Sequence, residues 1–161
     1  MFRIALALLF ILRLRFPADK SLFEVTRERY GVDGVRTLRR LETVSRRREK
    51  AALDLDFLKR CLDGEIFPKF LRIKLYRENL TRTSMYKEFQ LKLLENEINS
   101  KKQAIIHWDK VVTSIKNDLR RVVSVLDYIH FSSFVDRSVD SLRKNVTVTQ
   151  KKEICKLGWF L

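Results

Sequence analysis

Basic side chains gather in two stretches of the 161-residue sequence, at a spacing that suits contact with phosphate groups. The first stretch follows a predicted helix and contains Arg36, Arg39, Arg40, Arg46, Arg47, Arg48 and Lys50. Positions 36, 40, 47 and 50 fall within about one quadrant of that helix at about 100° per residue. The second stretch contributes Lys69, Arg72, Lys74 and Arg77. Because the guanidinium fork fits phosphate oxygens and counterion release sums over contacts, we predict non-specific binding of RNA or DNA.

The basic face allows a second interpretation, because a solvated helix surface would carry the same residues. Lys and Arg outnumber Asp and Glu by 34 to 20, which leaves a net charge of +14. Basic faces of this kind also keep coiled coils soluble. The sequence has no basic-zipper or helix-turn-helix spacing, which argues against base-specific recognition. The first hypothesis is therefore a nucleic-acid-contacting module, and the second is a structural coiled-coil interaction protein with a solvated basic face.

No residue set in the sequence has the spacing of a catalytic or metal site. Asp54 and Asp56 are two residues apart on a predicted helix, so their carboxylates point about 200° apart and cannot hold one ion. His107 and His130 have no Cys or carboxylate at the spacing of a metal site or a catalytic triad. Cys61 precedes an apolar helix position and is expected to pack as a small hydrophobic side chain. We expect a non-enzymatic protein with no metal and no cofactor.

Long helices must position these residues, since the sequence contains only four Gly and two Pro. That is too few for the turns of a β-sandwich or a barrel. Apolar residues instead recur at alternating steps of three and four, which predicts a coiled-coil seam on one helix from Ser84 to His130. The positions of this seam include Leu94, Ile98, Ile105, Trp108, Val112, Ile115, Leu119, Val122 and Leu126.

A shorter helix upstream follows the same alternation from Leu41 to Leu62. Asp33 can cap its start, and Asp63-Gly64 supplies the expected stop at its end. Together, the two helices predict an all-α fold, a long antiparallel helical hairpin or coiled coil with short flanking helices.

The two predicted helices differ in length by about 16 residues, or roughly 24 Å at about 1.5 Å per residue. The distal part of the longer helix, from Val111 to Ile129, then needs a cover. Three covers are available, namely the N-terminal segment, the stretch from Phe131 to Leu142, or a second chain. Because an exposed apolar seam promotes association, we expect a homodimer through the long helix unless the chain folds back over it.

We divide the chain into an apolar N-terminal segment (1–16), a basic helical coiled-coil domain (17–145) and a C-terminal tail (146–161) that we expect to be truncated. The apolar run within residues 4–16 is shorter than a bilayer span. It is open to three interpretations, as a helix packed on the protein, a secretory signal or an anchor on a membrane surface. Two cysteines are too few for a disulfide framework. A nuclear or cytoplasmic location is therefore expected, with secretion or membrane association as the alternative.

The order of these elements resembles a known protein family. A heptad helix ending in DLDFLKRCLDGEIFPKFLRIKLYRENL is followed by TSMYKEFQLKLLENEINSKK, and a long helix then closes with KKEICKLG. The specific part is the short turn at residues 66–70, IFPKF, together with the Leu93-Leu94-Glu95 run. Over about residues 35–158, the chain resembles the region that precedes the polymerase in Penelope-like retroelement reverse transcriptase proteins.

The resemblance implies a module of a mobile element that contacts RNA or associates with itself. The sequence contains neither a Tyr-x-Asp-Asp-like polymerase run nor a Gly-Ile-Tyr nuclease motif. We therefore expect a fragment lacking the polymerase, and no catalytic residue carries over to this chain. Residues 1–16 lie outside the resemblance.

Overall fold

A computed structural model of the protein describes residues 7, 10–11, 19–62 and 84–157, and three long helices account for most of them. These are α2 (Leu22–Leu62), α4 (Ser84–Val122) and α5 (Val125–Leu157). The described residues contain no strand. The all-α fold predicted from the sequence is confirmed.

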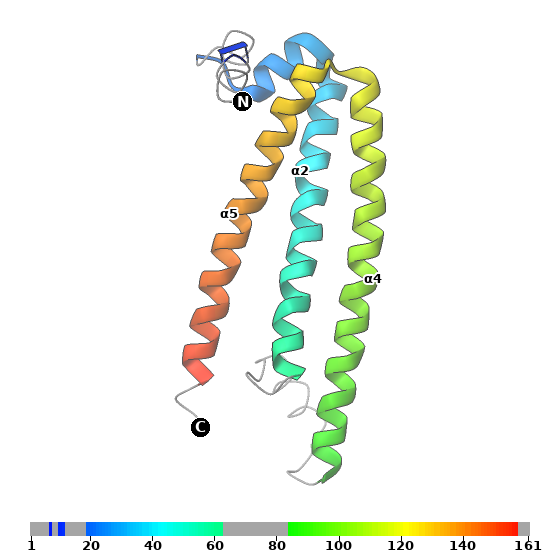
Figure 1. The fold of residues 1–161 in the computed structure, drawn as a ribbon, viewed down its shortest axis with the longest axis vertical. Coiled ribbons are helices and arrows are strands. Elements are labelled where there is room, and N and C mark those ends of the chain that lie inside the picture. The colour runs from blue at the N-terminus through cyan, green and yellow to red at the C-terminus, as the bar shows by residue number, and fades with distance from the viewer. Residues whose placement is uncertain (1–6, 8–9, 12–18, 63–83, 158–161) are drawn as a thin grey trace.

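Each helix runs antiparallel to the one before it in the chain, so α2 and α5 point the same way, and α2 lies in the middle (Figure 1). It packs along both α4 and α5, whereas α4 and α5 contact each other only sparingly. The predicted hairpin of two long helices is present as α2 and α4. In place of a short flanking helix, the structure has a third long one, and α5 continues through residue 145 to Leu157, where we had placed the start of a tail. We call the end that carries the α4–α5 turn the upper end.

The start of α2 is set by a reciprocal capping box. The backbone N–H of Ser21 donates to Glu24 Oε2 at 3.0 Å, and the Glu24 N–H donates to Ser21 Oγ at 3.2 Å. These two bonds satisfy N–H groups that have no partner within the helix. The helix therefore begins at Leu22, about two and a half turns before Gly31, rather than at Asp33.

A kink at Gly31 separates a short N-terminal limb of α2 from the long remainder. Gly31 has φ 72° and ψ −169°, a conformation that L side chains rarely adopt. The bend also requires a glycine at position 34, because a Cβ there would lie 2.6 Å from the Cβ of Tyr30. The limb from Leu22 to Tyr30 can thus turn across the upper end of the bundle.

The prediction of one helix from Ser84 to His130 is wrong. The first helix ends at Val122, and α5 begins at Val125 and runs back along α2. Ser124 caps the new helix, since its Oγ accepts the N–H of Asp127 at 3.3 Å. The predicted seam therefore does not continue along one rod. Its member Val122 is 67% exposed, and Leu126 lies half-buried on α5.

The rest of the predicted seam lies on the side of α4 that meets its neighbours. Leu94, Ile98, Ile115 and Leu119 are buried, and Ile105, Trp108 and Val112 are half-buried. The apolar contacts form two clusters. The upper core comprises Leu38, Leu41, Val44, Ile115, Leu119, Val123, Phe131 and Val135. The lower core comprises Leu58, Cys61, Leu94 and Ile98.

The chain supplies its own cover for the distal part of the seam. Phe131 and Val135 of α5 pack in the upper core beside Ile115 and Leu119, so the stretch from Phe131 to Leu142 is the predicted cover that the structure contains. The N-terminal limb adds Phe23, whose ring meets the Phe134 ring edge-on at 5.4 Å between centroids. None of the described helices has an apolar stretch long enough to cross a membrane.

Candidate nucleic-acid interface

Two grooves lie on different faces of α2, and each is lined by residues of α2, α4 and α5. The basic groove, of about 490 Å³, is lined by Arg46, Arg47, Lys50 and Asp54 of α2, with Lys101 and Trp108 of α4 and Leu142 of α5 among its other walls. The mixed groove, of about 300 Å³, includes Arg48 and Glu49 of α2, Asp109 and Lys116 of α4 and Asp136 of α5. Arg46 and Arg48 belong to different grooves because residues two apart on a helix point about 200° away from each other.

The two grooves differ in charge. Four basic residues and one acidic residue line the basic groove, whereas two basic and three acidic residues line the mixed groove. Both are built from the same three helices, so the difference comes from the side chains alone. The basic groove attracts anions, and the mixed groove largely neutralises itself.

The upper extension of the basic face carries Arg36, Arg39 and Arg40. Arg36 pairs with Asp33 at 3.3 Å, but its side chain is 77% exposed, so the pair leaves most of the guanidinium in water. The Arg39 guanidinium lies over the Phe23 ring, 4.9 Å from its centroid. Arg40 is exposed. These residues continue the line of positive charge above the basic groove toward the upper end.

Arg46 joins α2 to α5. Its Nη1 donates to the carbonyl oxygen of Ser138 at 2.8 Å and to Ser138 Oγ at 3.1 Å. The Ser138 hydroxyl in turn donates to Glu42 Oε1 at 2.7 Å. Arg46 is therefore held at the α5 edge of the basic groove, where it adds charge but has fewer free donors than an unbound arginine.

Arg47 stacks on an aromatic ring at the α4 edge of the same groove. Its guanidinium carbon lies 5.4 Å from the centroid of the Trp108 ring, and the residue stays exposed. A cation–π contact of this kind occupies none of the five N–H donors of the guanidinium. The arrangement orients Arg47 without consuming its hydrogen-bonding capacity.

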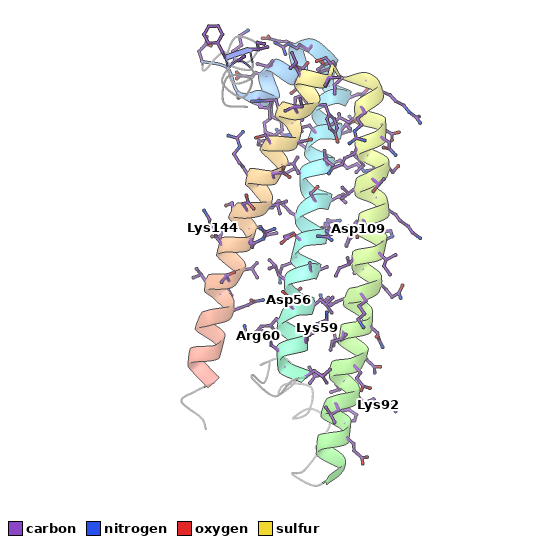
Figure 2. The ribbon with its side chains drawn as sticks, in the orientation of Figure 1. Asp56, Lys59, Arg60, Lys92, Asp109 and Lys144 are labelled. Atoms are coloured by element: carbon purple, nitrogen blue, oxygen red, sulfur yellow. The ribbon has the colours of Figure 1, made fainter. Side chains whose placement is uncertain are left out.

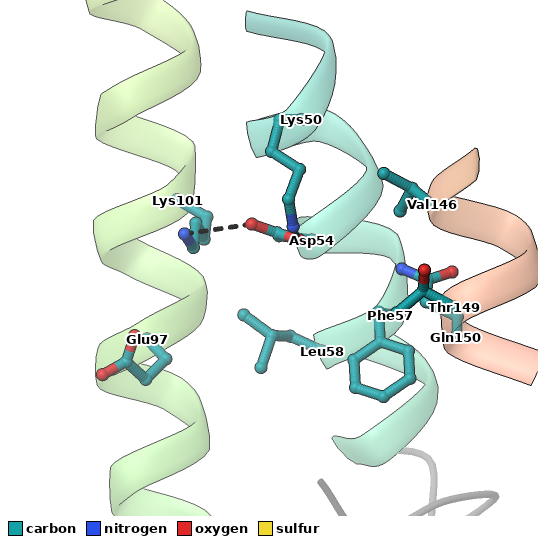
Figure 3. A pocket seen from close by; sticks show the side chains of 9 residues that line it. All are labelled: Lys50, Asp54, Phe57, Leu58, Glu97, Lys101, Val146, Thr149 and Gln150. Atoms are coloured by element: carbon teal, nitrogen blue, oxygen red, sulfur yellow. Dashed lines mark hydrogen bonds and ion pairs between the residues drawn. The ribbon is translucent and has the colours of Figure 1, made fainter. Parts of the chain in front are cut away.

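An acidic residue lies at the lower part of the basic groove. Asp54 is in contact with Lys50 through one carboxylate oxygen, and the other lies 3.2 Å from Lys101 Nζ (Figure 3). Another hollow, distinct from both grooves, is lined by the same three residues and by Phe57 of α2 and Val146 of α5. Asp54 thus draws two lysines together at the point where the two hollows meet.

Arg48 stands apart from the other predicted basic residues. It lines the mixed groove, where its Nε donates to Asp109 Oδ1 at 2.8 Å and its Nη1 lies 3.7 Å from Glu49. Glu49 also accepts a hydrogen bond from Arg143 of α5 at 3.0 Å. Arg48 therefore links α2 to α4 rather than joining the basic face.

The remaining predicted contacts, Lys69, Arg72, Lys74 and Arg77, lie outside the described residues. Sequence reasoning did not assign Lys101 to the basic surface, although that lysine is the polar position in the apolar alternation of α4. A lysine at such a position was the available signal. Lys92 on α4 and Lys144 on α5 line neither groove and project away from α2 (Figure 2).

The two histidines occupy different surroundings. His107 is exposed, and its ring meets the Trp108 ring edge-on, with 4.8 Å between centroids. Burial lowers the pKa of His130 below its usual value; Arg137 lowers this pKa further, and Asp127 opposes the shift. His130 is therefore mostly neutral at pH 7.

Cys61, Asp54 and Asp56 of α2 differ in their surroundings. Burial raises the pKa of the Cys61 thiol to about 12, which keeps the thiol protonated near neutral pH. Asp54 lines the basic groove, whereas Asp56 is exposed. Within the described part of the chain, no three His, Cys, Asp or Glu side chains gather as metal ligands would.

Comparison with known proteins finds no protein-family model, no curated protein and no solved structure that matches the chain. The resemblance to the Penelope-like region stays a prediction from the sequence.

Proposed function

We propose that the chain is a non-enzymatic helical module that binds the phosphate backbone of nucleic acid through the basic groove and the arginines above it. The observation that carries this proposal is the difference between the two grooves of α2. One scaffold presents a surface with four basic residues to one acid on one face and a nearly balanced surface on the other. A helix that needed basic residues only for solubility would have no reason to distribute them so unequally.

The contacts within each groove support the same assignment. In the mixed groove, Arg48 is committed to ion pairs with Asp109 and Glu49. In the basic groove, Arg47 stacks on Trp108, and Arg39 stacks on Phe23 just above it. Holding a long side chain in place before binding reduces the entropy lost on binding. These stacked arginines are therefore better suited to capture a phosphate than freely moving ones.

The strength of such binding depends on salt. Each phosphate contact contributes about 0.9 to the slope of log affinity against log salt for duplex DNA, and about 0.7 for single strands. If Arg36, Arg40, Arg47 and Lys50 each neutralise one phosphate, together they contribute a slope of about 3. We therefore expect binding that is measurable at low salt and that weakens steeply as salt is added.

The decisive experiment replaces Arg36, Arg40, Arg47 and Lys50 with Glu. The matched control replaces Lys92, Lys102, Lys110 and Lys144, which are exposed, lie outside both grooves and give the same change in net charge. Because Glu is as good a helix former as Arg or Lys, circular dichroism should show little loss of helix in either variant. Fluorescence anisotropy with labelled RNA and DNA should show binding abolished in the first variant and weakened only modestly in the control.

Two outcomes contradict the proposal. The first is a wild-type protein with no salt-dependent binding at physiological ionic strength, and the second is an equal loss of affinity in the two variants. Either result would leave the structural coiled-coil protein as the better hypothesis. One observation favours that alternative, namely that Arg36 and Lys50 each have an acidic neighbour on the same helix, Asp33 and Asp54.

Self-association and a retroelement origin are separate parts of the proposal. The apolar side of α4 packs on α2, so a homodimer would need a further surface, for which the exposed Leu91 and Ile106 of α4 are candidates. Sedimentation that shows only monomer would reject the dimer. A polymerase reading frame beside the coding sequence would support the retroelement origin, which in turn favours a nuclear or cytoplasmic location.

A further inference from the structure

The basic groove has an apolar floor beneath its charged rim. Ala51 is buried, Ala104 and Leu142 are half-buried, and the half-buried ring of Trp108 forms part of the wall. The basic residues Arg46, Arg47 and Lys50 line the same groove. A ligand that filled the groove would therefore need both a flat or apolar part and a negatively charged part.

Trp108 gives this floor a stacking surface. The Arg47 guanidinium lies over the indole, and the exposed His107 ring adjoins the same indole edge-on. Arg47 and Trp108 thus present two flat groups in the groove, and His107 adjoins Trp108 from outside its lining. Nucleic-acid bases stack both on aromatic rings and on arginine guanidinium planes.

We infer that the basic groove accepts single-stranded nucleic acid, with an unpaired base stacked at the Trp108–Arg47 pair and neighbouring phosphates at Arg46 and Lys50. This inference rests on the proposed function and adds a preference to it. In a duplex, the base faces are stacked on each other inside the helix and only phosphates, sugars and base edges face outward. A duplex could contact the rim but would leave the floor unused, whereas a single strand satisfies both.

The mixed groove shows why the aromatic wall matters. Its floor is apolar as well, with Leu41, Val112 and Val135 among its lining residues, but it contains no aromatic ring and more acid than base. It therefore lacks both the stacking surface and the charge. The same backbone arrangement on the other face of α2 serves as an internal comparison.

The first test uses the intrinsic fluorescence of Trp108. The sequence contains two tryptophans, so Trp159→Phe leaves Trp108 as the only indole. Titration with a short oligo-uridine RNA or oligo-thymidine DNA should quench Trp108 fluorescence at saturation, because base stacking on the pair alters its surroundings. A duplex of the same length should bind without comparable quenching. Saturating single strands that leave the fluorescence unchanged would overturn the inference, and this readout requires no change at Trp108.

The second test changes the stacking residue. Trp108→Leu should lower affinity for single strands about tenfold, in line with the loss of one stacked base. Duplex affinity should fall much less, because a duplex loses only the positioning of Arg47, and the salt slope should stay the same because no charge is removed. Trp108→Phe keeps an aromatic face and should retain most of the affinity. The matched control is Tyr128→Leu, because Tyr128 also lies under an arginine, Arg120 at 4.9 Å, but is outside the groove.

The outcomes separate the two claims. Two outcomes would overturn the single-strand inference and leave the proposed function intact. One is salt-dependent binding with equal affinity for single strands and duplex, and the other is an equal loss of affinity in Trp108→Leu and Tyr128→Leu. No salt-dependent binding to either form would overturn both. Similar behaviour of the RNA and DNA oligomers is expected, since stacking and phosphate contact are common to the two.

Discussion

The upper and lower ends of the bundle are held together by different contacts. At the upper end, the apolar core takes side chains from all three helices, including Leu38 of α2, Leu119 of α4 and Phe131 of α5. At the lower end, among the residues whose burial is described, the buried apolar side chains come from α2 and α4. The helix α5 therefore begins in a shared core, and further along it Val146, Thr149 and Gln150 lie beside a hollow.

A buried polar link adds to the upper end. The side chain of Asp127 is completely buried and accepts hydrogen bonds from Arg29 at 2.9 Å and from the Tyr30 hydroxyl. The Tyr30 oxygen also accepts the backbone N–H of Ser124 at 3.2 Å. The N-terminal limb of α2 is thereby fastened to the turn between α4 and α5. At the lower end, the corresponding polar contact is the partly exposed set of Lys50, Asp54 and Lys101.

The attachment of α5 to α2 changes character along its length. Val135 packs in the upper core, Ser138 then bonds Arg46 and Glu42, and Arg143 bonds Glu49. Further down, Val146 faces a hollow rather than a packed core. The basic groove opens where apolar packing gives way to polar attachment. The groove thus lies where the shared apolar core ends and polar side chains such as Arg46 and Asp54 join the helices.

The largest expected difference between the two ends concerns a charge placed in each core. Ile115→Asp puts an unpaired carboxylate among all three helices and should lower the free energy of unfolding by about 4 kcal/mol or more. Ile98→Asp at the lower end should cost about 2 kcal/mol, because the helix ends can open locally and expose the charge. Thermal melting by circular dichroism measures both. Equal losses would show that the two ends are equally cooperative and would reject the comparison.

A smaller effect is expected from the buried polar link. Asp127→Ala removes the acceptor shared by Arg29 and Tyr30 and should destabilise the fold by about 3 kcal/mol, since breaking a buried ion pair leaves its partners unsatisfied. Asp109→Ala is the matched control, because it breaks an ion pair with Arg48 whose carboxylate is 53% exposed. Exposed pairs contribute about 1 kcal/mol or less. Urea denaturation that ranks the two variants in the opposite order would contradict this account.

The smallest effect concerns the protonation of Cys61 in the lower core. Its pKa of about 12 in the folded protein lies above the ordinary value of 9.0. Below pH 9 the thiol keeps its proton in both states, so stability does not depend on it. As pH rises from 9 toward 12, the unfolded thiol loses its proton while the buried one keeps it, so the free energy of unfolding falls.

Two measurements check this titration, in a Cys155→Ser background that leaves one thiol. Stability should decline above pH 9, and Cys61→Ala should remove that part of the decline. Reaction of Cys61 with a thiol reagent at pH 8 should be much slower in the folded protein than in urea. A rate close to that of the unfolded protein would mean that the lower end opens freely.

Much of the helical structure could be read from the sequence. Alternating apolar steps of three and four predicted both α2 and α4. The predicted stop at Asp63-Gly64 lies outside the described residues. These features are local, since helix period and capping depend on residues a few positions apart. The sequence also carried a signal for the turn that was missed, because Ser124 and Asp127 have the Ser-x-x-Asp spacing of a helix start.

Only the tertiary structure decided where the long seam would break. The apolar alternation continues arithmetically through Val122 and Leu126, and the turn contains neither Gly nor Pro to interrupt it. The chain turns there because α5 can then bury Phe131 and Val135 against Ile115 and Leu119. That gain is a contact between distant residues, so periodicity within one helix cannot reveal it.

The candidate site divides in the same way. Helical period alone placed Arg36, Arg40, Arg47 and Lys50 on one face of α2, because the direction of each side chain on a helix depends only on its position in the sequence. The helices that pack beside α2 decide the rest. They determine which of these residues share a groove with Trp108 and Lys101, and they place Asp109 where Arg48 bonds it. The charges of the face were determined by the sequence, whereas the groove that gathers some of them into a candidate site was determined by packing.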